Sequence, residues 1–127
     1  MRKGLYHNLK AVPAIASGSK SDAADGTEID RKGSQGILFV LNTGTITSAG
    51  DFGVKVQESD ETGTGYEDAA ADDVISGAPA TLAANSAYQV EYIGKKRFVR
   101  LALTKAGGTS IQLGAVAILG HEHIRLP

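Results

Sequence analysis

Acidic side chains dominate residues 58–73, and residues of this type could serve three kinds of function. The segment contains no lysine or arginine, and its carboxylates are Glu58, Asp60, Glu61, Glu67, Asp68, Asp72 and Asp73. Several carboxylates on a turning backbone suit a calcium ion. Two carboxylates can also carry out the acid–base chemistry of a glycosidase. The third interpretation is an acidic surface that contacts a basic partner.

The spacing of these carboxylates argues against the first two interpretations. A twelve-residue calcium loop requires Gly at its sixth position and Glu at its twelfth, and the segment does not match that pattern. Glu58 and Asp60 share one face of one predicted strand, whereas glycosidase carboxylates flank the scissile bond about 5 to 9 Å apart. We therefore interpret the segment as a contact surface or a solvated rim and not as a reaction centre.

Two histidines near the C-terminus, His121 and His123, lie on the same side of an extended chain. Such a pair can chelate a transition metal, but a structural or catalytic site needs a third or fourth ligand. The remaining histidine, His7, is far away in the sequence. The Gly-rich runs "GTGY" and "AGGTS" lie in predicted turns, and no nucleophile–base pattern appears. We expect no metal, no cofactor and no enzymatic activity.

A basic cluster occurs in "GKKRFVR", which contributes Lys95, Lys96, Arg97 and Arg100. Basic side chains near aromatic ones can bind nucleic acid. The nearby Tyr88 and Tyr92, however, share an apolar strand face with Val90, which is typical of a core. The formal net charge of the chain is −1, which gives no general attraction to nucleic acid or to anionic membranes. The acidic segment and the basic turn together favour contact with a charged protein surface or with another copy of the chain.

Length and composition predict one folded domain over residues 1–127. The chain has no cysteine, so disulfides and thiolate zinc sites are excluded. No apolar run approaches the roughly 18 residues of a membrane span. The N-terminus "MRKGLYHNLKAVPAIASGSK" imitates a signal peptide, but its apolar run is short and is broken by Pro13. We interpret this segment as part of the mature protein.

The hydrophobic pattern alternates with a period of two, which predicts β-strands. The strong candidates are 36–42, 52–59, 87–94, 97–105 and 110–120, and the weak ones are 9–16, 26–32 and 79–84, of which the first two read as edge strands. The run "TKAGGTSIQ" predicts a hairpin between the last two strong strands, 17–27 reads as a loop, and 66–75 allows one helical turn at most. This pattern is typical of an all-β, antiparallel β-sandwich.

The faces of these strands predict a core of aliphatic side chains. The run "GILFVLN" is apolar throughout, as in a strand that is covered on both faces. Gly114 lies inside the last strand and predicts a bend, a bulge or a close approach of another backbone. The residues expected to be mostly buried are Ile37, Phe39, Leu41, Phe52, Val54, Val56, Val90, Val99, Leu101, Leu103, Ile111, Leu113, Val116 and Ile118.

The runs "GDFGVKVQESDETGTGYEDA" and "KRFVRLALTKAGGTSIQLGAVAILGH" resemble small proteins of tailed bacteriophages. These are capsid cement or decoration proteins, in particular those of short-tailed phages such as the Bordetella phages. The resemblance covers roughly residues 36 to 121 and includes no catalytic signature. It implies a jelly-roll-like sandwich that binds the outside of an HK97-type capsid and bridges major capsid subunits. The chain would then be made in the host cytoplasm and would become part of the virion surface.

Two further expectations concern partners. The basic, amphiphilic N-terminus, with Leu5, Tyr6 and Leu9, has no obvious place in the sandwich, so residues 1–8 read as an extended arm that contacts a neighbour. A cement protein that spans two capsid subunits fits near a two-fold axis, so we expect self-association, most simply as a homodimer. The alternatives are a carbohydrate-binding sandwich, which would require exposed aromatic residues, and a sandwich enzyme, which would require a polar constellation.

Overall fold

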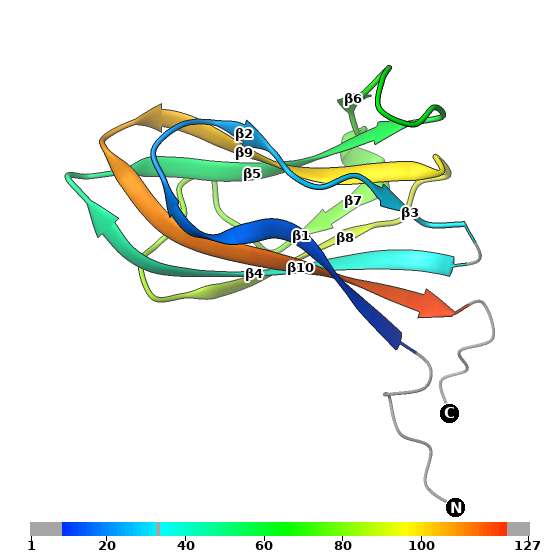
Figure 1. Ribbon diagram of the computed structural model, residues 1–127, viewed down its shortest axis with the longest axis horizontal. Helices are drawn as coiled ribbons and strands as arrows, with labels where there is room; N and C mark the ends of the chain where they lie inside the picture. Colours follow the sequence, from blue (N-terminus) through cyan, green and yellow to red (C-terminus); the bar gives the residue numbers. More distant parts are fainter. Residues whose placement is uncertain (1–8, 33, 122–127) are drawn as a thin grey trace, which may run out of the picture.

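The computed structural model describes residues 9–32 and 34–121, which form two antiparallel β-sheets packed face to face (Figure 1). The first sheet contains, in spatial order, β1 (Leu9–Lys20), β10 (Ser110–His121), β4 (Ser34–Thr47), β8 (Ala87–Tyr92) and β7 (Val74–Ser76). The second contains β2 (Ala24–Asp25), β9 (Phe98–Gly107), β5 (Asp51–Ser59) and β6 (Glu67–Asp68), and β3 (Ile29–Asp30) also pairs with β9. The predicted all-β, antiparallel sandwich is therefore confirmed.

The order of the strands is that of a jelly roll. The strands β2 and β3 both pair with β9 and together act as one interrupted strand. If the short β7 is also set aside, the ten labelled strands reduce to eight, which form two four-stranded sheets, β1-β10-β4-β8 and β2/β3-β9-β5-β6. Most consecutive strands lie in opposite sheets, so the chain repeatedly crosses between the layers, as a double-sheet jelly roll requires.

The prediction of a hairpin between the last two strong strands is wrong. β9 pairs with β5 in the second sheet, whereas β10 pairs with β1 and β4 in the first. The turn between them crosses from one sheet to the other at Gly108, whose φ of 75° is disfavoured for other residues. A side chain there would also overlap the backbone of Ala49, in the crossing from β4 to β5. The Gly-rich turn looked like a hairpin because local sequence does not specify which strand pairs with which.

The core lies between the sheets and consists mainly of aliphatic side chains. Phe39 and Leu41 on β4 and Leu101 on β9 are fully buried, and Val54 is partly buried against them. These side chains follow the alternation expected of strands with one covered face. The prediction that 36–42 is covered on both faces is therefore wrong, since Leu38 and Val40 are only half-buried. The buried cluster also contains Leu82, whose backbone N–H donates to the carbonyl of Phe52 at 2.8 Å.

The prediction of which side chains are buried in the second half of β10 is wrong by one residue. Ala115, Ala117 and Leu119 face the core, whereas Val116 is 42% exposed and Ile118 is only half-buried. The alternation continues unbroken through Gly114. In the pairing with β4 the register shifts between Ile111 and Leu113 and again between Gly120 and His121. At Gly114 the predicted close approach is confirmed, because Ser17 of β1 lies against it. The sequence pattern predicts the wrong face because the small alanine side chains point into the core, whereas the larger Val116 and Ile118 point outward.

Several weaker predictions can also be compared with the structure. The edge positions of 9–16 and 26–32 are confirmed, because β1 lies at the edge of its sheet and β3 pairs only with β9. Residues 79–84 are not a strand but a loop, and part of 17–27 is strand, since β1 extends to Lys20 and β2 follows. The segment 66–75 contains a single 3-10 turn, Ala71–Asp73. Within the described residues, no helix has the length and apolar character needed to span a membrane.

Candidate protein-contact surfaces

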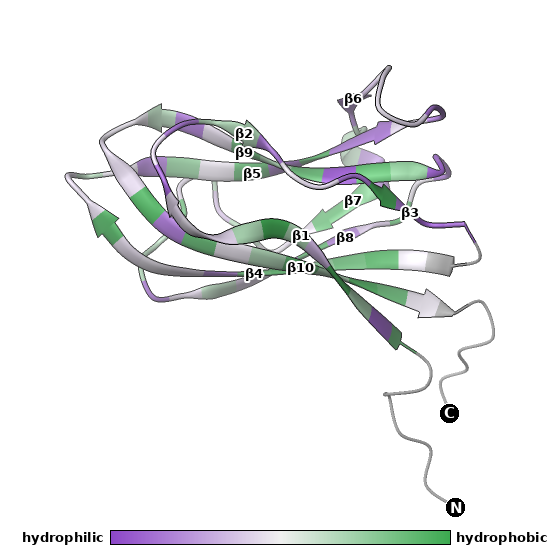
Figure 2. Ribbon diagram, viewed as in Figure 1, coloured by the Kyte–Doolittle hydropathy of each residue, from purple (hydrophilic) through white to green (hydrophobic). Residues whose placement is uncertain are grey.

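Most of the charged residues singled out in the sequence gather at one end of the sandwich (Figure 1). The loop between β5 and β6, the strand β3 and the turn before β9 meet there, and Figure 2 shows hydrophilic colouring on these loops. We call this region the charged end and define it as residues 28–32, 57–68 and 94–100. It unites the acidic segment and the basic turn, which lie far apart in the sequence.

Two carboxylates of the acidic segment are paired within the molecule, one with the basic turn and one with β5. The Lys96 amino group lies 2.6 Å from the Asp60 carboxylate. Asp68 accepts a hydrogen bond from Gln57 at 3.1 Å and lies 3.1 Å from the amino group of Lys55. These contacts lower the pKa of Asp68 and raise that of Lys96. All of these groups are largely solvated, so each pair contributes little to stability, but together they reduce the charge that is free for a partner.

Two arginines of the basic cluster, Arg97 and Arg100, are held in place by residues of β3 and of the loop before β6. Arg97 donates two parallel hydrogen bonds to the Asp30 carboxylate, at 2.8 and 2.9 Å. The hydrogen bonds from Arg97, and one from the backbone of Lys32, lower the pKa of Asp30 to about 2. Arg100 lies 4.0 Å above the ring of Tyr66, in cation–π contact. Both guanidinium groups are thus oriented by contacts with their own chain.

Glu58 faces the interior side of β5 and not a partner. It accepts a 2.6 Å hydrogen bond from the hydroxyl of Tyr92, whose side chain is fully buried, and this hydroxyl accepts a 3.0 Å bond from the Lys96 N–H. Burial, followed by the bond to Glu58, raises the pKa of Tyr92 to about 12. Any side chain at Gly94 would overlap the Tyr92 ring, so the "IGKK" turn requires a glycine there. These contacts fix the turn that carries the basic residues.

A second carboxylate organises the loop between β5 and β6. Glu28 accepts hydrogen bonds from the Thr62 hydroxyl at 2.7 Å and from the Gly63 N–H and the Tyr66 hydroxyl, both at 2.6 Å. These three bonds lower the pKa of Glu28 below its ordinary value. Burial, followed by the hydrogen bond from its hydroxyl to Glu28, raises the pKa of Tyr66. Because Glu28 lies directly before β3, it ties the acidic loop to the edge of the second sheet.

Sequence reasoning missed two residues of the charged end, Arg31 and Lys32. Together with Lys95 and Arg97 they line a hollow of about 380 Å³. Both residues occur in "IDRKG", whose pattern predicts only a weak edge strand. The fold brings the run beside the turn at Lys95, since Arg31 donates to the carbonyls of Lys96 and, at 2.8 Å, Gly94.

The outer face of the first sheet is a second candidate surface. Partners in an antiparallel ladder share a face. One cross-strand row is Ala11–Ile118–Leu38–Glu91–Ile75, and the next is Pro13–Val116–Val40–Gln89. We call these two rows the outer face. Ile75 and Val116 are 58% and 42% exposed, and Leu38, Val40 and Ile118 are half-buried. In Figure 2 the strands β1, β10 and β4 carry hydrophobic colouring.

The remaining candidates are placed differently. Leu9 begins β1, where it pairs with Gly120. Leu5, Tyr6 and His123 lie outside the described residues, and His121 is described only as the end of β10. Each aromatic residue in 9–32 and 34–121 is at least partly buried, so that part of the chain offers no fully exposed ring on which a sugar could stack.

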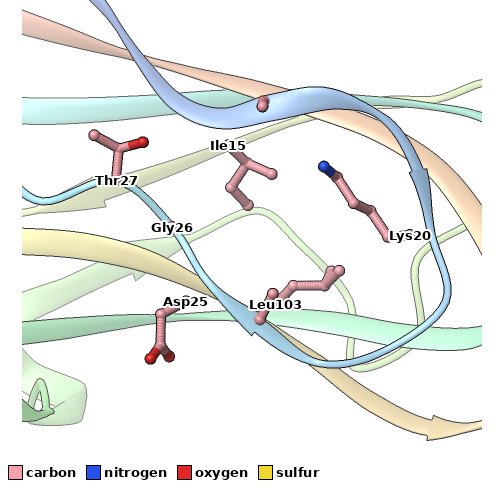
Figure 3. A pocket seen from close by; sticks show the side chains of 8 residues that line it. Ile15, Lys20, Asp25, Gly26, Thr27 and Leu103 are labelled. Atoms are coloured by element: carbon pink, nitrogen blue, oxygen red, sulfur yellow. The ribbon is translucent and has the colours of Figure 1, made fainter.

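A pocket of about 200 Å³ lies at the edge of the sandwich, where β1 and the segment 24–27 separate (Figure 3). Ile15 and Leu103 form its apolar walls, and the amino group of Lys20 points into it. The Asp25 carboxylate points away from Lys20 in this view. A single amino group on aliphatic walls offers no acid–base pair, so the pocket gives no reason to propose a reaction.

Comparisons with known proteins give a likeness of fold. No family model matches the chain, and no curated protein matches it. Among solved structures, the chain is similar to the crystal structure of SPBc2 prophage-derived protein YomS, with a TM-score of 0.55 and 13% sequence identity. The match covers 88% of this chain and 92% of the other. At this identity the likeness shows a shared fold and nothing about the residues of a site.

Proposed function

We propose that the chain is a structural, non-enzymatic protein of a bacteriophage virion. It binds the outer surface of an HK97-type capsid and stabilises the shell by bridging major capsid subunits. It is made in the host cytoplasm and is carried on the capsid surface. The single observation that supports binding to a protein is the outer face of the first sheet.

The two central strands of that sheet are apolar on both sides. On the inner side Phe39 and Ala117 are fully buried, whereas Val40 and Val116, on the outer side, have no second layer above them in the described part of the chain. A sheet that faces water on one side normally alternates apolar and polar residues. Contiguous apolar surface on a soluble domain marks an interaction site. Burial of this surface favours a complex by about 25 cal/mol per Å² of apolar area, and the entropy lost on association offsets part of this gain.

The identity of the partner is supported by two likenesses. The sequence of residues 36 to 121 resembles the sequences of capsid cement and decoration proteins, and the fold is similar to that of a prophage-derived protein. A shell displays the same binding site many times, so each copy needs only modest affinity when it engages more than one subunit. A small domain that folds without disulfides suits this use. Self-association as a homodimer would place two outer faces on neighbouring subunits.

The proposal is tested by sedimentation with empty shells assembled from the major capsid protein of the same genome. The wild-type chain is expected to pellet with the shells. Val116→Asp places a charge in the middle of the outer face and is expected to lower occupancy strongly, because a desolvated carboxylate without a partner opposes binding. Gln112→Asp is the matched control, since Gln112 is also exposed on β10 but lies outside the two apolar rows.

Circular dichroism must show that both variants keep the strand signal of the wild-type chain. A wild-type chain that stays in the supernatant at high concentrations of chain and shell would refute capsid binding. Equal occupancy of the two variants would instead exclude the outer face as the contact.

A further inference from the structure

Four cationic side chains surround one hollow at the charged end. The hollow has a volume of about 380 Å³ and is lined by Arg31, Lys32, Lys95 and Arg97. The first two residues precede β4 and the last two precede β9, so the fold gathers like charges from two distant segments. Like charges repel, so an anion that enters the hollow would offset the repulsion among these four side chains.

The Arg31 guanidinium is held rigidly before any ligand arrives. It donates to the carbonyls of Lys96 and Gly94 and lies 5.6 Å above the ring of Tyr92. Tyr92 is fixed by burial and by its bond to Glu58. An arginine that is fixed in this way loses little side-chain entropy when it binds an anion.

The charge of the hollow is only partly neutralised by the chain itself. Asp30 pairs with Arg97. Among the described residues, Arg31, Lys32 and Lys95 take part in no ion pair, and Arg31 meets carbonyl dipoles instead of a carboxylate. Four positive side chains against one carboxylate leave an excess of three charges around one small volume. Carboxylates or phosphates would therefore be attracted to it.

We propose that this hollow binds a short acidic segment of the partner protein, whose Asp or Glu carboxylates enter between Arg31, Lys32, Lys95 and Arg97. The inference rests on the proposed function, because the partner is the capsid surface, and it adds the chemistry of the contact. The apolar outer face supplies area, and the hollow sets the orientation of the chain on the subunit.

The surroundings of the hollow favour a short acidic segment over nucleic acid. Asp60 lies against Lys96 of the turn, Glu61 is exposed on the neighbouring loop, and Glu67 is exposed on β6. A polynucleotide extends its negative charge over many residues and would have to cross these carboxylates. A loop with two or three acidic residues can enter the hollow alone.

The first test compares two double variants in the shell sedimentation experiment. Lys32→Ala/Lys95→Ala removes two charges from the hollow, and Lys10→Ala/Lys20→Ala removes two from β1. We expect shell binding of the first variant to fall about tenfold at low salt and that of the control to stay within about twofold. The difference should shrink at 1 M salt, where the Debye length is about 3 Å.

The second test uses NMR titration of the wild-type chain with a hexaglutamate peptide and with a single-stranded oligonucleotide. The peptide is expected to shift the amide signals of residues 31–32 and 95–97, and Lys32→Ala/Lys95→Ala should abolish these shifts. Equal shifts in the variant, or a clear preference for the oligonucleotide, would overturn the inference.

The two proposals fail separately. If wild-type and variant chains pellet equally well with shells, the acidic-segment inference is wrong and capsid binding stands. If the wild-type chain does not pellet, capsid binding is wrong, and the peptide titration still decides whether the hollow accepts carboxylates.

Discussion

Leu101 and Val116 are both aliphatic residues on central strands, and their truncation should have clearly different costs. Leu101 is fully buried on β9, whereas Val116 is 42% exposed on β10. Leu101→Ala removes three carbon atoms, which are worth about 2.4 kcal/mol at about 0.8 kcal/mol per buried carbon. The cavity left between the sheets adds to this loss, so the free energy of unfolding should fall by about 2 to 5 kcal/mol.

Val116→Ala removes two carbon atoms from a surface that water already reaches. Full burial of both would be worth about 1.6 kcal/mol, and the exposed fraction of 42% reduces the loss to about 1 kcal/mol or less. No cavity term is added, because solvent fills the vacated space. The truncation of Leu101 should thus cost at least about twice as much as that of Val116.

Urea unfolding followed by far-ultraviolet circular dichroism measures both costs. The slope of the free energy against urea concentration should be the same for the wild-type chain and the two variants, so that midpoint shifts report stability alone. An equal loss for both variants, or a larger loss for Val116→Ala, would show that β10 turns the opposite face to the core. The assignment of the outer face, and the function proposed from it, would then be wrong.

Three further predictions concern the charged end and the N-terminus. Because its folded-state pKa is depressed to about 2, Asp30 contributes stability that is present above its ordinary value of 3.8 and is lost as the pH falls toward 2. Asp30→Asn should therefore destabilise the chain by about 1 kcal/mol or less at pH 7 and clearly less near pH 2, where about half of the Asp30 carboxylate is protonated in the folded chain, as measured by thermal unfolding at both pH values. Glu28→Gln should make amide exchange at Gly63 several-fold faster while exchange in β9 stays unchanged, and unaltered exchange at Gly63 would show that the loop does not depend on Glu28. Deletion of residues 1–8 should keep the melting temperature, because the described sandwich begins at Leu9, and should weaken shell binding; unchanged binding would exclude the arm.

The strands themselves could be predicted from the sequence because alternation is a local property. In "FGVKVQES" apolar residues alternate at Phe52, Val54 and Val56, and Phe52 and Val56 are buried as this pattern indicates. Pro13 marked β1 as an edge strand, since proline lacks the N–H that a central ladder needs. The same local reasoning could not show which face of β10 is buried after Gly114. Small and large apolar residues alternate there, so the sequence pattern of either face is compatible with a core.

The sequence alone determined that the chain forms an all-β sandwich and where its acidic and basic residues cluster along the chain. Only the tertiary structure decided how distant segments meet. Lys96 and Asp60 are 36 residues apart, and Arg97 and Asp30 are 67 residues apart, yet they form pairs that neutralise Asp60, Lys96 and Arg97 of the predicted contact surface. The same packing brings Arg31 to the basic turn and leaves Val116 on an uncovered face. The physical reason is that side-chain alternation depends on neighbours in the chain, whereas sheet order, burial of a second face and ion pairing depend on which strands come together in space.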